Sequence, residues 1–222
     1  SAGDVNGDGL ADLIVGAPFD YNNGGTSFVV FGKTDGTAVQ LSAIEDNSNT
    51  GGFVINGTDG RSGYSVSGAG DVNGDGLADF IVGDSTKYSN AYYGGASYVV
   101  FGKTDGSAVE LSAVALSTAD SGGFVINSSV NYAQIGYSVS DAGDVNGDGL
   151  ADLIVGSSSS YSYYDQVSSF VVFGKTDGTA VELSAIDDNS NTGGFVIKGV
   201  SAGDQSGSSV SSAGDVNGDG LA

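Results

Sequence analysis

The hydrophobic positions of this chain fall in short runs that are separated by stretches rich in glycine and serine. Four runs in the middle of the chain show the pattern, at residues 77–83, 97–102, 123–127 and 136–140. Their β-branched and aromatic content favours strands. Continuous apolar segments such as Phe-Ile-Val predict sheets that are covered on both faces. Helical periodicity is weak, and only residues 108–114 suggest a turn of helix.

The same set of runs recurs along the whole chain. Phe-Gly-Lys-Thr-Asp-Gly begins at Phe31, Phe101 and Phe173, and Gly-Gly-Phe-Val-Ile begins at residues 51, 122 and 193. A repeat of this length with four short strands is typical of a β-propeller, in which each repeat forms one blade. The pattern therefore predicts an all-β fold built from β-propeller blades of four antiparallel strands.

The repeat also predicts the blade boundaries, with the strands of each repeat named A to D in chain order. Twelve strands give three blade equivalents that are offset by one strand. Residues 1–61 hold strands B, C and D of the first blade, 62–134 the second blade, 135–206 the third, and 207–222 the A strand of a next or closing blade, near Ser208–Ser212. Because propellers have typically 4–8 blades, we expect part of a larger propeller, or one that other copies of the chain complete. Residues 1–11 reappear unchanged as 212–222, as in a piece of a longer array.

The nine-residue segment Asp-Val-Asn-Gly-Asp-Gly-Leu-Ala-Asp occurs three times, and a fourth copy lacks its last aspartate. Oxygen-bearing side chains at positions 1, 3, 5 and 9, with glycine at position 6, are the pattern of a calcium loop. Position 7 would add its backbone carbonyl. The sequence thus predicts about three Ca²⁺ ions, one for each complete loop. The predicted ligands are Asp4, Asn6, Asp8, Leu10 and Asp12; Asp71, Asn73, Asp75, Leu77 and Asp79; and Asp144, Asn146, Asp148, Leu150 and Asp152.

Two other interpretations of these loops are open. An EF-hand or dockerin-type loop begins with the same residues, but Val15, Val82 and Val155 stand where an EF-hand has a bidentate acid. The loop here also leads into a strand rather than a helix. A metal-free turn is the second alternative, because aspartate, asparagine and glycine are ordinary turn residues. Three identical copies favour calcium, in a structural role between adjacent strands, and the incomplete fourth loop is expected to bind weakly or not at all.

Charge and composition exclude several classes of function. The net charge of −21, from 27 acidic and 6 basic residues, disfavours nucleic acids and anionic membranes as partners. The chain has no cysteine and no histidine, which excludes disulfides and the usual zinc sites. No apolar run is long enough for direct membrane insertion. Without cysteine or histidine, and with many acids assigned to metal loops, we do not expect an enzyme. Calcium in a cysteine-free chain favours a bacterial protein that is secreted or held at the cell surface.

The order of motifs resembles a known repeat. Gly-Tyr-Ser-Val-Ser, then the acidic loop, then Leu-Ile-Val-Gly-Ala-Pro resembles the FG-GAP repeat of integrin α-subunit propellers, and still more closely the calcium-binding FG-GAP arrays of large secreted bacterial proteins. Residues 16–18 carry Gly-Ala-Pro, whereas residues 83–85 and 156–158 depart from it. The FG element remains only as Gly-Tyr at residues 63–64 and 136–137. The resemblance implies that the A–B and C–D loops share one face, and that the opposite face carries ligands in integrins.

On that opposite face the B–C loops, at residues 17–26, 84–96 and 157–168, differ between repeats and are rich in tyrosine. Tyrosine combined with serine, asparagine and glycine favours binding loops. The predicted partner-binding residues are Tyr21, Tyr88, Tyr92, Tyr93, Tyr132, Tyr161, Tyr163 and Tyr164. The partner would be a protein or glycan ligand, or a second copy of the chain.

Three hypotheses of function follow. The first is an extracellular calcium-binding propeller module for cell-surface adhesion or protein or glycan binding. The alternative is a self-assembling structural subunit of an extracellular filament, sheath or surface layer. The third is a non-catalytic propeller beside an enzyme in a longer chain.

Overall fold

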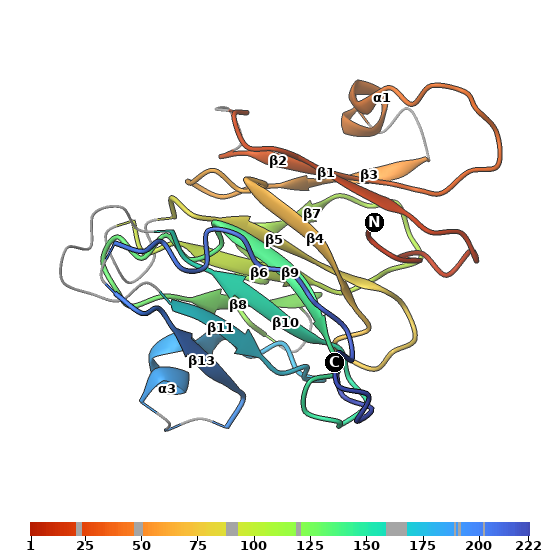
Figure 1. Cartoon of the computed structure of the whole chain (residues 1–222). Helices are drawn as coiled ribbons and strands as arrows, with labels where there is room; N and C mark the ends of the chain where they lie inside the picture. Colours follow the sequence, from red (N-terminus) through yellow and green to blue (C-terminus); the bar gives the residue numbers. More distant parts are fainter. Residues whose placement is uncertain are drawn as a thin grey trace.

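The computed structural model describes residues 1–20, 24–46, 51–87, 93–118, 121–158, 168–188, 190, 192–201 and 203–222. In this part of the chain three sheets follow one another from β1–β3 to β13 (Figure 1). The first contains β1 (Leu13–Ala17), β2 (Thr26–Val30) and β3 (Gly52–Asn56). The second contains β4 (Ser65–Gly70), β5 (Asp79–Asp84), β6 (Ala96–Val100) and β8 (Gly123–Asn127). The third contains β9 (Ser138–Gly143), β10 (Asp152–Gly156), β11 (Ser168–Val172) and β13 (Gly194–Lys198).

Neighbouring long strands within each sheet are antiparallel and run in the order of the sequence. This confirms the predicted all-β fold with four-stranded, blade-like sheets. The first sheet has only the three long strands that the sequence assigns to it. The long strands of each sheet lie within residues 1–61, 62–134 and 135–206 respectively.

Two short strands connect neighbouring sheets, one at each junction. β7 (Val109–Glu110) pairs in parallel with β3, and β12 (Val181–Glu182) pairs in parallel with β8. Each is followed directly by one turn of helix, α2 (Leu111–Val114) or α3 (Leu183–Asp187). The predicted turn of helix within residues 108–114 is therefore confirmed, and α1 (Leu41–Glu45) stands at the equivalent place in the first repeat. The two short strands were not predicted from the sequence, because two residues are too few to give an alternating pattern.

The core lies between the sheets. β2, β5 and β6 are buried along their whole length, as predicted for sheets covered on both faces. One apolar cluster includes Phe53 and Phe80 and joins the first and second sheets; another includes Phe124 and Leu153 and joins the second and third. The first and third sheets are more exposed, because in the described part of the chain each has a neighbouring sheet on one side only. Leu13 of β1 is 56% exposed and Ile197 of β13 is 44% exposed.

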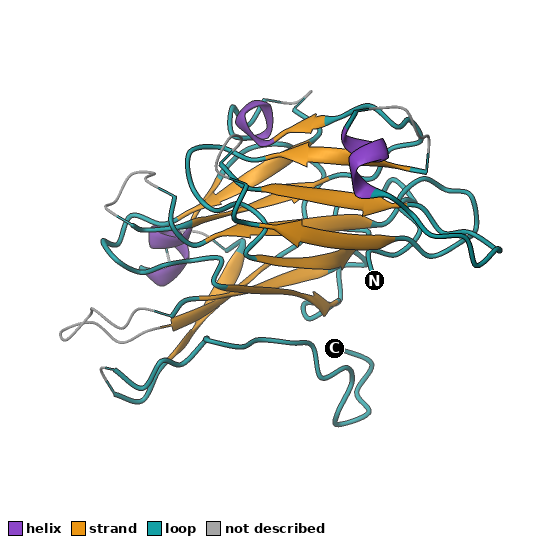
Figure 2. Cartoon of the chain, turned by 90° about the horizontal axis from the view of Figure 1, so that it is seen from above, coloured by secondary structure: helices purple, strands orange, loops and turns teal. Residues whose placement is uncertain are grey.

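The strand predicted near Ser208–Ser212 does not form in this structure. Residues 208–215 are irregular and run beside the third sheet (Figure 2). The equivalent segments β4 and β9 are strands because each pairs with the strand that follows its acidic loop. The segment at 208–215 has no such neighbour within the described residues, so its backbone gains no ladder of hydrogen bonds.

Candidate metal centre and ligand-binding face

Each acidic loop is folded around the carboxylate of its first residue. In the second loop, Asp71 Oδ1 accepts the N–H groups of Gly74 at 2.7 Å and Asp75 at 3.1 Å, and its Oδ2 accepts the N–H of Gly76 at 2.9 Å. Both glycines have left-handed backbone, with φ of +79° and +89°. Such backbone favours glycine and brings the N–H groups toward a single acceptor. The first residue therefore sets the shape of the loop.

The third and fifth residues of the loop bind each other. Asn73 Nδ2 donates to Asp75 Oδ2 at 2.9 Å, and the N–H of Asp75 donates to Asn73 Oδ1 at 2.9 Å. Asp75 Oδ1 also accepts the N–H of Leu77 at 2.9 Å. The first and third loops repeat these bonds, and so does the incomplete fourth loop. The loop shape is therefore encoded in its first seven residues and does not require the ninth.

The ninth residue has a separate place in the structure. Asp12, Asp79 and Asp152 are fully buried. Asp79 Oδ2 accepts the N–H of Val72 at 2.8 Å, and Oδ1 accepts the N–H of Gly102 at 2.8 Å. The aspartate thereby joins the acidic loop to the segment that follows β6. The other two aspartates make the same two kinds of bond.

Burial makes the negative charge of this aspartate costly. Removal from water raises the pKa of Asp79 to about 7; the N–H groups of Gly102 and Val72 oppose the rise, and the charges of Asp75 and Asp71 add to it. Burial also raises the pKa of Asp152. A positive charge nearby would therefore favour the ionised form of Asp79 at neutral pH.

The donor chemistry of the loops fits a hard cation, whereas their geometry shows no coordination shell. Carboxylate and amide oxygens are the ligands that Ca²⁺ takes. Hydrogen bonds join the third and fifth side chains of each loop, whereas the first side chain binds backbone N–H groups of the loop and the ninth binds other backbone N–H groups. Among the residues that the structure describes, no group of three or more acidic side chains is arranged to hold a metal ion. The ligand set predicted from the sequence, including the carbonyls of position 7, stays a prediction.

The loop that begins with Phe-Gly-Lys lies at the same end of the sheets as the acidic loops. The Lys103 ammonium pairs with Asp105 at 2.9 Å and lies 4.8 Å from the ring centre of Phe53 in the preceding sheet. Lys175 repeats this arrangement over Phe124, at 5.0 Å. The repeating lysine thus has a structural contact across each junction between sheets.

Replacing Lys103 by glutamine is expected to lower the free energy of unfolding by about 1 kcal/mol, because the cation–π contact and its ion pair are lost. Lys33 is the matched control: it pairs with Asp35 in the same way, but no aromatic ring of the described residues lies against it. Urea unfolding of Lys103→Gln and Lys33→Gln measures the difference. Equal losses would show that the ring contributes nothing.

Two tyrosines meet at the opposite end of the strands. The rings of Tyr93 and Tyr132 stack with centroids 6.2 Å apart and an interplanar angle of 28°. Tyr93 closes a B–C loop and Tyr132 belongs to a D–A loop, so a B–C loop and a D–A loop meet at this point. Both residues have left-handed backbone, with φ of +51° and +60°. The N–H of Gln134 donates to the Tyr93 carbonyl at 3.2 Å and holds the two loops together.

Of the eight tyrosines predicted to bind partners, Tyr93 and Tyr132 are described and adjacent. The others lie outside the described residues: Tyr21, Tyr88, Tyr92, Tyr161, Tyr163 and Tyr164.

A second aromatic pair on this face was not predicted from the sequence. Tyr64 and Tyr137 have ring centroids 5.1 Å apart and hydroxyl oxygens 3.4 Å apart. They precede β4 and β9, and the antiparallel pairing of these strands places them at the end where β5 and β10 stop. The recurring Gly-Tyr at residues 63–64 and 136–137 is the signal in the sequence that marks them. Nearby, the Arg61 guanidinium lies 5.5 Å from the ring centre of Phe19, which is 57% exposed.

The FG-GAP repeat model matches residues 1–30, 62–100 and 136–178 of this chain. Each matched segment contains one complete acidic loop and the two strands that follow it. The chain belongs to the FG-GAP repeat family. Two expectations from the sequence are thereby established, namely the FG-GAP repeat and a fold of propeller blades.

Several curated proteins are similar to this FG-GAP chain. Integrin alpha pat-2 of Caenorhabditis elegans is 32% identical over 207 residues, which cover 88% of this chain and 16% of that protein. Phosphatidylinositol-glycan-specific phospholipase D of Bos taurus is 32% identical over 165 residues, or 71% of this chain and 18% of that protein. Integrin alpha-7 of Mus musculus is 30% identical over 158 residues, or 69% and 11%.

The FG-GAP chain spans less than a fifth of the length of these relatives. All three are animal proteins, and none of them tests the expected similarity to bacterial arrays. In the described part of the chain, no helix is long and apolar enough to cross a membrane.

Proposed function

We propose that this chain is a ligand-binding propeller module that works in adhesion outside the cell and is stabilised by calcium. The observation that carries the proposal is the stacked pair Tyr93 and Tyr132, both held in left-handed backbone. Such backbone is uncommon for a bulky residue, costs of order 1–3 kcal/mol, and clusters at functional sites. Membership of the FG-GAP family and the similarity to integrin α chains support an adhesive role.

The surroundings of the pair support a contact surface for a protein or glycan. Tyr64 and Tyr132 are each 40% exposed, and Phe19 is more exposed still. Aromatic rings whose positions are fixed by their neighbours lose little conformational freedom on binding, which makes them effective anchors. We therefore assign ligand binding to the end of the strands opposite the acidic loops.

We propose a structural role for calcium. In each complete loop the ion would be held by the side chains of positions 1, 3, 5 and 9 and by the carbonyl of position 7. When bound, it would neutralise carboxylates that otherwise repel one another. Burial of Asp79 supports this role. The groups that shift its pKa are backbone N–H groups and two other aspartates, and none of them is a cationic side chain that would balance its charge.

The proposed module consists of three blade equivalents at residues 1–61, 62–134 and 135–206, with 207–222 contributing to a further blade. We propose that it is not an enzyme. The chain has neither histidine nor cysteine, and its most buried aspartates accept backbone N–H bonds. The similarity to a phospholipase D is compatible with a binding propeller that accompanies an enzyme domain.

The ligand face is tested by replacing Tyr93 and Tyr132 together with asparagine. Asparagine tolerates left-handed backbone, so the variant removes the rings without adding strain. Beads coated with the chain are measured for adhesion to surfaces that carry fibronectin, collagen or laminin, and the soluble chain is measured on a glycan array. We expect the double variant to lose adhesion by roughly tenfold or more, because stacked aromatic anchors carry much of the binding energy.

The control is Leu116→Asn, because Leu116 is 73% exposed and follows α2, away from both tyrosines. Its adhesion should equal that of the parent chain, and the stabilisation of both variants by calcium should be unchanged. Full adhesion of the tyrosine variant, or no adhesion of the parent chain to any of these probes, would refute the proposed function.

A further inference from the structure

We infer that Arg61 is a carboxylate-binding anchor, and that the partner of the ligand face is a protein that presents an aspartate or glutamate side chain to it. The inference rests on the proposed function, because it names the chemistry that this face would recognise. It begins with the charges of the molecule. The chain has 27 acidic residues and six basic ones, of which five are lysines and Arg61 is the sixth.

Arg61 is the only basic side chain of the described residues without an ion pair. Salt bridges of 2.8–2.9 Å join each lysine to an aspartate: Lys33 to Asp35, Lys87 to Asp59, Lys103 to Asp105, Lys175 to Asp177 and Lys198 to Asp187. Arg61 is exposed, and all six basic residues lie within the part of the chain that the structure describes. An exposed guanidinium that stays unpaired in so acidic a chain is available to an anion from outside.

Aromatic side chains lie close to the Arg61 guanidinium. It is 5.5 Å from the ring centre of Phe19. Its charge also reaches the second aromatic pair: the hydrogen bond to Tyr137 raises the pKa of Tyr64, and the charge of Arg61 opposes that rise. A guanidinium beside aromatic rings keeps a planar fork of N–H donors that matches a carboxylate in a bidentate pair. Arginine and tyrosine grouped in this way are typical of binding hot spots between proteins.

A fully buried carboxylate holds the loop that carries Arg61. Asp84 Oδ1 accepts the N–H of Arg61 at 2.8 Å, and Asp84 Oδ2 accepts the hydroxyl of Ser62 at 2.9 Å. Asp84 is 0% exposed. The other repeats have Ala17 and Ser157 at this position, so the buried aspartate is particular to the repeat that follows Arg61. The backbone of the anchor is thereby fixed before a partner arrives, which lowers the ordering cost of binding.

The other repeats show that the fold needs no charge at the position of Arg61. The N–H of Tyr64 donates to the Arg61 carbonyl at 3.2 Å. The same turn bond between residues three apart ends on Gln134 in the next repeat, at 3.2 Å, and on Gln205 in the one after, at 3.0 Å. Glutamine therefore serves the turn in both of these repeats, and the charge of Arg61 is left for a role outside the fold.

The net charge of −21 hardly weakens a contact made at Arg61. At about 0.15 M salt, exposed charges separated by more than about 8 Å are largely screened. The acids nearest to Arg61 in the chain and in its anchor are already bound, because Asp59 pairs with Lys87 and Asp84 holds backbone and hydroxyl donors. A carboxylate that reaches Arg61 therefore meets a cation whose charge is not yet compensated.

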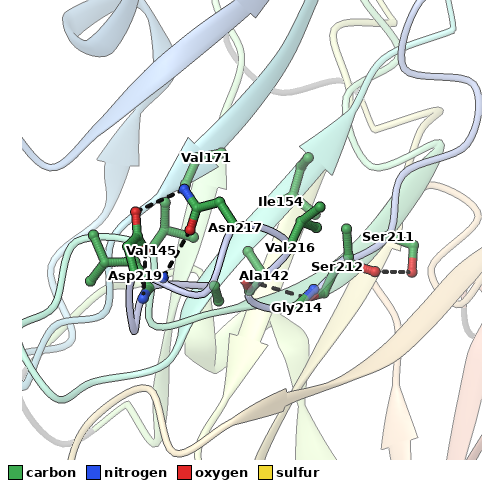
Figure 3. Close-up of a pocket in the computed structure, with 13 residues that line it drawn as sticks. Ala142, Val145, Ile154, Val171, Ser211, Ser212, Gly214, Val216, Asn217 and Asp219 are labelled. Carbon is green, nitrogen blue, oxygen red and sulfur yellow. Dashed lines mark hydrogen bonds between the residues drawn. The ribbon is translucent and has the colours of Figure 1, made fainter.

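A pocket beside the third sheet offers the opposite chemistry. It is lined by Val145, Ile154 and Val171, together with Asn217 and Asp219, which are hydrogen-bonded to each other (Figure 3). None of the residues that line it is basic. An acidic side chain would meet the Asp219 carboxylate there and no cation, so this pocket is unsuitable for a carboxylate.

Titration of the Arg61 signal tests the anchor without any measurement of adhesion. Because Arg61 is the only arginine, its side-chain Nε–H gives a single NMR signal in the nitrogen-15-labelled chain. The calcium-loaded chain is titrated with the blocked dipeptide acetyl-Phe-Asp-amide, and with acetyl-Phe-Asn-amide as its neutral control. We expect the aspartyl peptide to bind roughly tenfold more tightly, because hydrogen bonds between charged groups are stronger than neutral ones.

Adhesion of the full chain tests the partner. Arg61→Gln introduces the residue of the other repeats, and it should lower adhesion to the protein-coated surfaces by roughly tenfold or more. Blocking the carboxylates of those surfaces as neutral amides should do the same to the parent chain. Arg61→Lys should retain only part of the adhesion, since lysine keeps the charge but lacks the bidentate fork. Lys33→Gln is the control, because it changes the net charge equally at the opposite end of the strands and should adhere like the parent chain.

The two measurements separate this inference from the proposed function. Equal binding of the two dipeptides would overturn the anchor, and so would full adhesion of Arg61→Gln when the tyrosine variant loses its adhesion. Either result leaves the proposed function standing. A parent chain that adheres to no surface would refute the proposed function, and the titration would still decide whether Arg61 binds a carboxylate. Adhesion to acidic glycans that Arg61→Gln abolishes, with no effect of blocked protein carboxylates, would overturn the protein partner.

Discussion

Calcium is expected to raise the melting temperature of the chelated chain by roughly 15–30 °C. At about 10 mM calcium and a dissociation constant of about 0.1 mM, each site contributes about 2.7 kcal/mol. Three complete loops then contribute roughly 8 kcal/mol. In a chain of this size each kcal/mol shifts the melting temperature by roughly 2–4 °C. Differential scanning calorimetry in chelator and in calcium measures the shift.

The physical reason is the charge of the loops. Each complete loop brings four acidic or amide side chains into one short segment, and the whole chain carries a net charge of −21. Ions bind the folded loops, whereas the unfolded chain holds the same side chains too far apart to share a cation, so binding favours the folded state. Magnesium should stabilise less at the same concentration, because it gives up its water reluctantly.

A matched pair of variants separates specific binding from general screening of charge. Asp75→Asn removes one carboxylate from a complete loop, and Asp219→Asn removes the equivalent carboxylate from the loop that lacks its ninth residue. Both change the net charge equally, but only Asp75→Asn should reduce the shift, by about a third if the three sites are equal. Equal melting temperatures in chelator and calcium, or equal effects of the two variants, would contradict specific sites.

The sequence was sufficient for the repeated parts of the fold. The strand at 123–127 was predicted with the bounds that β8 has, because identical segments recur three times and each is flanked by glycine. The short strands β7 and β12 were not foreseen, since their pairing with the preceding sheet is a tertiary contact that two residues cannot encode. The strand predicted at 208–212 is absent for the opposite reason: the local signal is present and the partner strand is lacking in the described residues. Its sequence is that of a strand, but a strand forms only where another strand is beside it.

The candidate site was predicted in part for similar reasons. Spacing identified the acidic loops, and in the structure their third and fifth side chains are hydrogen-bonded to each other while the first binds backbone N–H groups of the loop. Spacing gave no sign that Asp12, Asp79 and Asp152 would be buried and bound to backbone N–H groups, because burial depends on the sheets that surround the loop. The pair Tyr64 and Tyr137 was missed because 73 residues separate its members. Only the stacking of one blade on the next makes them neighbours.

In chelator, the chain is expected to become less stable as the pH rises from about 5 to about 7.5, because of Asp79. Its pKa is 3.8 for an ordinary aspartate and about 7 in the folded chain. Between these values the folded state keeps a proton that the unfolded state has lost, so this stabilisation is complete at low pH and disappears as the pH passes the folded pKa. At about 1.4 kcal/mol per pKa unit, the loss amounts to about 4 kcal/mol over the full span between the two pKa values, of which about 2.5 kcal/mol falls between pH 5 and pH 7.5.

Asp79→Asn isolates this contribution from the repulsion among the other acids. Asparagine is neutral at every pH and can accept only one of the two N–H bonds from Val72 and Gly102. The variant should therefore be clearly less stable than the parent at pH 5, and the difference should narrow toward pH 7.5. Urea unfolding across this range, with chelator present, measures both curves. Parallel curves would show that Asp79 does not titrate in this window, and a gap that widens with pH would show that its carboxylate is stabilised as the anion.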